Sequence, residues 1–137
     1  MPVSLKSSLS KLATSSVLVS PGNGFPEPGH ASVLLVFEDG TTLQAEFWRL
    51  TEDGKATFSS FDHQQKYGLP TVIDAVHELR EKLTSRLVVT ASHDQETGDL
   101  LFEFTDSIKL QILNVTGYEV WEIRFSDGTG EYSNYAK

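Results

Sequence analysis

The sequence predicts an α+β domain in which antiparallel strands predominate over helices, and three observations carry this prediction. Runs of alternating apolar residues bounded by turn dipeptides recur along the chain, as from Val33 to Phe37 before Asp39-Gly40. Only two segments, Leu5–Leu12 and Thr71–Arg86, have the 3.6-residue apolar period of a helix. The chain has 137 residues, 39% hydrophobic and 22% charged. We therefore expect one soluble domain, residues 1–137, with a core of its own.

The first half is expected to contain a helix, a long loop and four strands. The helix places Leu5, Leu9 and Leu12 on one face. The segment Pro21–Gly29 is a loop because it is too rich in Pro and Gly for a regular element. Each strand is bounded by turn residues, and the four are Val17–Val19, Val33–Phe37, Thr41–Ala45 and Lys55–Phe61.

The second half begins with the most regular helix of the chain, after a stop at Gly68-Leu69-Pro70. Its apolar stripe is that of an element half buried on a sheet. Thr71 is the expected N-cap, and Asp74 three residues later completes a capping box with Asp in place of Glu. The strands expected after this helix are Leu87–Ser92, Leu100–Phe104, Ile108–Ile112, Glu119–Phe125 and Glu131–Tyr135.

The two halves resemble each other. An ungapped offset of 67 positions pairs residues 34–67 with 101–134 and gives eight identical residues, where unrelated segments of that length give about two. At this offset Gly54 stands opposite Trp121. We therefore predict a tandem duplication of an α-β-β-β-β unit, approximately residues 3–67 and 70–134. A single half would leave one sheet face bare, so both halves are expected to share one core.

Composition excludes several classes of function. The chain has no Cys, which excludes disulfides, thiolate nucleophiles and Cys-based zinc sites. Nineteen acidic and eleven basic residues give a net charge of −8, which is unfavourable for binding nucleic acid or an anionic membrane. No run approaches the ~18 apolar residues of a membrane span, and no secretory signal is recognisable. The expected location is the cytoplasm.

The sequence contains no recognisable catalytic motif such as a nucleophile elbow, a P-loop or a zinc-protease signature. No catalytic residue, metal site or cofactor is predicted, and no enzyme class is assigned. Carboxylates and an imidazole do gather at metal-ligand spacing on the second helix, but no other helix offers matching ligands, so a solvated face is favoured. These residues are Asp74, His77, Glu78 and Glu81.

Two His–carboxylate neighbours remain as candidates, Asp62-His63 and His93-Asp94. One interpretation makes them polar turn residues. The other makes them polar groups of a ligand pocket at the junction of the two repeats, because such junctions favour clefts. That pocket would belong to a small-molecule-binding protein or an enzyme.

Aromatic residues accumulate near the end of the chain, and they are interpreted first as core and second as a protein interface. The candidates are Tyr118, Trp121, Tyr132 and Tyr135. The hairpin spacing of Gly98–Phe104, Ile108–Leu110 and Asp127-Gly128, with the strand Tyr118–Ile123, resembles small uncharacterised bacterial β-rich domains. Some of these are immunity proteins of polymorphic toxin systems. The resemblance covers about the last forty residues and brings no catalytic residues with it.

Small size, negative charge and this resemblance favour a non-enzymatic protein-binding module, for example an immunity-type inhibitor of a basic toxin. A charge of this sign speeds encounter with a basic partner. Residues 87–137 hold nine acidic and three basic residues, so the partner is expected there. A small-molecule-binding protein or enzyme is the alternative, and self-association as a scaffolding homodimer is a third.

Overall fold

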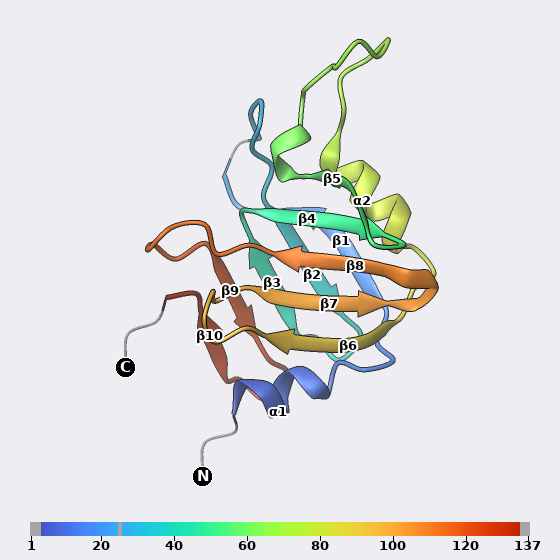
Figure 1. The fold of residues 1–137 in the computed structure, drawn as a ribbon. Coiled ribbons are helices and arrows are strands. Elements are labelled where there is room, and N and C mark those ends of the chain that lie inside the picture. Colours follow the sequence, from blue (N-terminus) through green and yellow to red (C-terminus); the bar gives the residue numbers. More distant parts are fainter. Residues whose placement is uncertain (1–3, 25, 135–137) are drawn as a thin grey trace.

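Alternating apolar residues build two five-stranded antiparallel sheets that lie face to face (Figure 1). This computed structural model describes residues 4–24 and 26–134. The first sheet has the order β1 (Val17–Pro21), β2 (Val33–Phe37), β3 (Thr42–Ala45), β9 (Trp121–Arg124) and β10 (Gly130–Tyr132). The second has the order β5 (Lys55–Ser59), β4 (Trp48–Glu52), β8 (Ile108–Ile112), β7 (Leu100–Phe104) and β6 (Val88–His93). The predicted α+β class with antiparallel sheets is confirmed.

The core lies between the two sheets. In β2 and β7, which belong to different sheets, every second residue is buried. The rings of Phe37 and Phe102 stack across the interface with centroids 5.6 Å apart. Full burial of one such large apolar side chain is worth about 1.5–3 kcal/mol, so this two-layer core holds the sheets together.

Two α-helices pack against the edges of the sandwich. α1 (Leu5–Ser10) packs on β6, and α2 (Ala75–Leu83) packs on β1. Leu9 of α1 and Leu79 of α2 are fully buried. No helix in the described part of the chain has the length and apolar character needed to cross a membrane.

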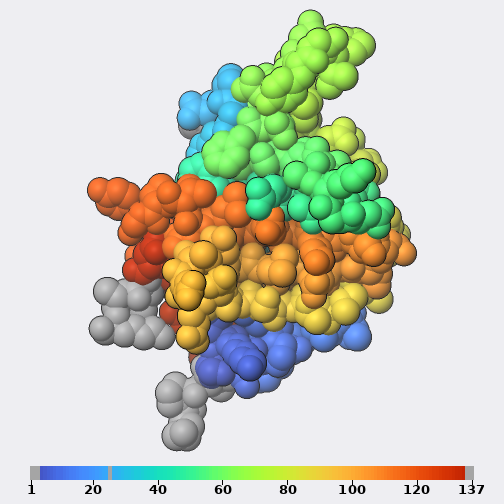
Figure 2. All heavy atoms as spheres, in the orientation of Figure 1, coloured from blue at the N-terminus to red at the C-terminus, as the bar shows by residue number. Residues whose placement is uncertain are grey.

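The expected start of the second helix at Thr71 is wrong. The backbone of Ile73 is bonded to Gln64 and Gln65, at 2.7 and 2.9 Å, which holds this segment in a loop. The N-cap is instead Asp74, whose side chain accepts from the backbone N–H of His77 at 3.1 Å. The long loop before α2 projects from the body of the molecule (Figure 2).

Strand β4 is absent from the expected order of elements, so the first half contains five strands rather than the expected four. The second half contains five strands, as its sequence predicts, and the predicted four-strand unit is one strand short. The alternating pattern of β3 ends at Ala45, and Glu46-Phe47 carries the chain into the other sheet. The two sheets consequently exchange strands. β4 and β5 lie beside β8 in the second sheet, while β9 and β10 lie beside β3 in the first.

The two tryptophans occupy corresponding places in the two sheets. Trp48 pairs with Ile112 on β8, and Trp121 pairs with Ala45 on β3. Ala45 and Ile112 are themselves 67 positions apart. The expected correspondence of Gly54 with Trp121 is therefore wrong, because two residues connect β3 to β4 whereas eight connect β8 to β9.

Candidate functional site

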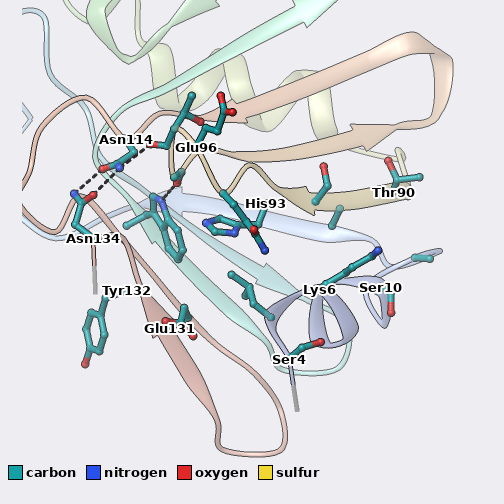
Figure 3. A pocket seen from close by; sticks show the side chains of 18 of the residues that line it. Ser4, Lys6, Ser10, Thr90, His93, Glu96, Asn114, Glu131, Tyr132 and Asn134 are labelled. Carbon is teal, nitrogen blue, oxygen red and sulfur yellow. Dashed lines mark hydrogen bonds between the residues drawn. The ribbon is translucent and has the colours of Figure 1, made fainter. Parts of the chain in front are cut away.

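A groove of about 1180 Å³ lies along β6. It is bounded by α1, by the turn that follows β6 and by β10. Figure 3 shows His93 in the middle of the groove, with Lys6 on the side of α1 and Asn114 and Asn134 at the opposite end. The groove thus brings together residues of both halves of the chain.

His93 contributes a polar side chain to this groove. Its ring meets the Trp121 ring edge to face, with centroids 6.1 Å apart at 75°. Within the described residues, the His93 side chain makes no hydrogen bond. Trp121 is only 3% exposed and donates its indole N–H to the Gly98 carbonyl at 2.9 Å. The Trp121 ring therefore supports His93 from one side, and no described residue bonds either ring nitrogen of His93.

Asp94 is used to build the turn beside the groove. Its carboxylate accepts from the backbone N–H groups of Glu96 and Thr97, at 2.8 and 3.3 Å. Its own backbone N–H donates to Asp99 at 2.9 Å. Asp94 therefore fixes the turn, whose residues Gln95, Glu96, Thr97 and Gly98 line the groove.

The far end of the groove is closed by paired amides. The side chains of Asn114 and Asn134 donate to each other at 2.7 and 2.8 Å. Asn134 also donates to the carbonyls of Thr116 and Tyr118, both at 2.7 Å, which fixes the loop between β8 and β9. Tyr118 itself is 84% exposed on this loop.

The interface candidates are distributed over different environments. Trp121 belongs to the core, whereas Tyr118 is exposed and lies outside the groove lining. Tyr132 is half buried on β10 and lines the groove. Tyr135 lies outside the described residues. Of the three candidates that the structure describes, Trp121 and Tyr132 thus lie at one site.

His63 lines a second, smaller hollow of about 420 Å³ beside α2, and Asp62 precedes it in the chain without lining that hollow. His63 is 6% exposed, and its Nδ1 accepts from the backbone N–H of Ala75 at 3.1 Å. Asp62 accepts from the Ser59 backbone at 2.9 Å and from the Tyr67 hydroxyl at 2.9 Å. His63 and His93 therefore line separate hollows, and the structure does not bring the two histidines together.

Three of the four residues of the acidic cluster on α2, Asp74, His77 and Glu81, make local contacts. Asp74 caps the helix, and His77 lies 3.5 Å from Glu81 one turn later. At the other end of the helix, Lys82 lies 2.8 Å from Glu52 of β4. The hydrogen bond from Lys82 lowers the pKa of Glu52 below its ordinary value.

Comparison with known proteins adds no assignment. No family model, curated protein or solved structure matches this chain. The geometry of the groove therefore carries the functional argument.

Sequence reasoning missed the projecting loop, residues 64–73. Its base is closed by the bonds of Ile73, and the Leu69 N–H donates to the Lys66 carbonyl at 2.7 Å. Its exposed apolar residues are Tyr67, Leu69 and Val72. At its foot Phe61 stacks on Phe47 with centroids 5.6 Å apart. Large apolar side chains among turn formers were the available signal, since loops without a partner seldom carry them.

Proposed function

We propose that this protein is a non-enzymatic acidic protein-binding module, and that it acts as an immunity-type inhibitor covering a basic surface of a toxin. The observation that carries the proposal is the long groove beside an edge strand. Its volume of about 1180 Å³ exceeds the roughly 300–1,000 Å³ of ordinary small-molecule pockets. A segment of a partner protein fits such a groove better than a small ligand does.

Charge supports the same proposal. The chain carries a net charge of −8, and residues 87–137, which contribute β6 and most of the groove wall, hold nine acidic and three basic residues. Opposite charge steers association and makes the affinity depend on salt. The partner is therefore expected to present a basic surface.

The test is co-expression of the chain with the product of the neighbouring gene in its native host, followed by purification of the complex. We expect a stable complex whose dissociation constant rises about tenfold between low and high salt, because screening removes the attraction. Rescue of growth from the toxicity of the partner would identify the immunity role. Absence of any protein partner would contradict the proposal, and so would an affinity indifferent to salt.

The alternative is a small-molecule-binding protein or an enzyme with its pocket at the junction of the two halves. One observation favours it: both halves line the groove, and the His93 imidazole there has no hydrogen bond to any residue that the structure describes. A screen of small metabolites by nuclear magnetic resonance would decide. Saturable shifts confined to His93 and Trp121 would favour the alternative, and no shift would exclude it.

We also propose that the two halves arose by duplication of one unit, with β1–β5 corresponding to β6–β10. The strand orders support this. The first sheet has the order β1-β2-β3-β9-β10, and the second sheet, taken from its β6 edge, has the order β6-β7-β8-β4-β5. Each strand of one half thus has the place in its sheet that the corresponding strand of the other half has in the other sheet. Hydrogen bonds repeat as well. Trp48 donates its indole N–H to Ala31 at 2.9 Å, as Trp121 does to Gly98, and those acceptors are 67 positions apart.

A further inference from the structure

We propose that the groove binds an extended basic segment of the partner, which adds to the second sheet as a strand alongside β6. This inference rests on the proposed protein-binding function and specifies its site and the chemistry of its ligand. Strand addition is a common way for a sheet edge to bind a peptide, because the backbone supplies affinity and alternate side chains supply specificity.

The first support is the open edge of β6. In the described structure β6 pairs with β7 alone, and it forms one edge of its sheet. At its start, Val88 is already bonded on the outer side, accepting from Thr14 at 2.7 Å and donating to Ser15 at 2.8 Å. Further along, Ala91 and His93 make no backbone hydrogen bond outside the ladder among the described residues.

Alternation along the strand directs these groups into the groove. In an antiparallel ladder the residues whose N–H and C=O face the partner strand alternate with residues whose groups face away. The backbone N–H and C=O of Val88 point away from β7. The register skips one residue of β6 between Val88 and Thr90, so the alternation relative to β7 continues at Thr90. The backbone groups of Ala91 and His93 therefore also point away from β7. A strand entering the groove would continue the contact that residues 14–15 begin.

The second support is the corresponding edge of the first sheet, formed by β1, where a backbone carbonyl is already bonded by a side chain of α2. Val19 on β1 pairs with Leu35, and Ala91 on β6 pairs with Phe102, 67 positions after Leu35. Arg80 of α2 donates its guanidinium Nε to the Val19 carbonyl at 2.9 Å. Helix α1 donates no side-chain hydrogen bond to β6 among the described residues. The carbonyl of Ala91 is therefore suited to an arginine supplied from outside.

The side chains of the groove fit such a segment. Leu5 and Val89 offer apolar contact, and the Trp121 wall lies beneath His93. Glu96 adds negative charge at the turn, where Asp94 is its neighbour. An extended segment alternating apolar and basic residues would place the former against the wall and the latter beside the carboxylates.

The test is selection of peptides from a phage library of random heptapeptides on the full chain, followed by affinity measurements with the selected peptides. We expect peptides that alternate apolar residues with Arg or Lys. Ala91→Pro removes the outward N–H and leaves the ladder to β7 intact, so it should weaken binding by about tenfold or more. Ala91→Ser retains the N–H and is the matched control, with affinity unchanged.

Glu96→Arg gives an independent measurement if Ala91→Pro does not fold. Glu96 is exposed on the turn, so the variant should fold and bind basic peptides about fivefold or more weakly. Glu27→Arg makes the same charge change at an exposed position outside the groove lining and should leave the affinity nearly unchanged. Failure of selection to enrich any peptide overturns the groove proposal. Binding of the selected peptides by the Ala91→Pro and Glu96→Arg variants with the affinity of the unchanged protein overturns it as well. If a protein partner still co-purifies with the chain in these cases, the proposed protein-binding function stands and only its placement in the groove is lost.

Discussion

The edges formed by β1 and β6 have the same place in their sheets and very different surroundings. At β1, α2 has nine residues, and Arg80 bonds the Val19 carbonyl. Pro21 stands at the register position that His93 holds on β6, and proline has no N–H to offer another strand. At β6, α1 has six residues, and a groove remains. Equivalent strand arrangements can thus be closed or open, depending on a few side chains.

The largest loss of stability should come from replacing the two tryptophans, and it tests whether both contribute equally to the free energy of unfolding. Trp48 is 0% and Trp121 3% exposed. We expect Trp48→Ala to lower the free energy of unfolding by about 3–5 kcal/mol, and Trp121→Ala by somewhat less because the groove lets water fill the space. Urea denaturation measures both. A larger loss for Trp121→Ala would reverse the comparison.

The buried serines that bond these tryptophans should give the next largest effect. Ser60 Oγ accepts from the Trp48 backbone at 3.2 Å, and Ser133 Oγ accepts from Trp121 at 3.1 Å and from Val120 at 2.7 Å. Alanine at either position leaves buried N–H groups without an acceptor, at a cost of about 1–3 kcal/mol. We expect the greater loss at Ser133 in thermal unfolding. Ser92→Ala, at an exposed position on β6, should be nearly neutral.

Arg80→Ala should open the closed edge. The variant loses the bond to Val19 and is expected to cost about 1 kcal/mol. Hydrogen exchange should rise at β1 and remain the same at β6. Arg80→Lys keeps the charge but not the planar guanidinium, so it should restore only part of the protection. Unchanged exchange at β1 would show that α2 closes this edge without the arginine.

The smallest effect concerns pH. Because Lys82 lowers the pKa of Glu52 in the folded state, this carboxylate stabilises the fold above its ordinary pKa of 4.5, and the contribution disappears as the pH falls through the lower folded value. Glu52→Gln should cost less than about 1 kcal/mol at pH 7 and should flatten the loss of stability below pH 4.5. Urea melts at several pH values measure this. An unchanged dependence of the free energy of unfolding on pH would mean that the ion pair of Glu52 with Lys82 does not stabilise the contact between α2 and β4.

The sequence was sufficient to predict the strands whose alternation is regular, such as Val33–Phe37 and Leu100–Phe104. It was insufficient at β4, because the passage between sheets at Glu46-Phe47 leaves no Pro or Gly to mark it. The start of α2 was missed because its position depends on bonds between Ile73 and residues distant along the loop.

The site was only partly predictable for the same reason. His93 lies in the groove, as one interpretation expected, but the open edge of β6 depends on which strand lies beside it and on the absence of an arginine from α1. His63 was named as a pocket residue and is found bonded to the first residue of α2. Pairing in space, which the sequence pattern does not specify, decides both outcomes.

Residue-resolved hydrogen exchange, measured with and without a selected basic peptide, tests the difference between the two edges most directly. In the free protein we expect the amides of Ala91 and His93 to exchange about tenfold or more faster than the amide of Val19, because Val19 is buried on β1, which α2 packs against, whereas Ala91 and His93 line the groove. The peptide should slow exchange at Ala91 and His93 and leave Val19 unchanged. Equal protection of the two edges in the free protein, or protection at β1 instead of β6 on binding, would contradict the account.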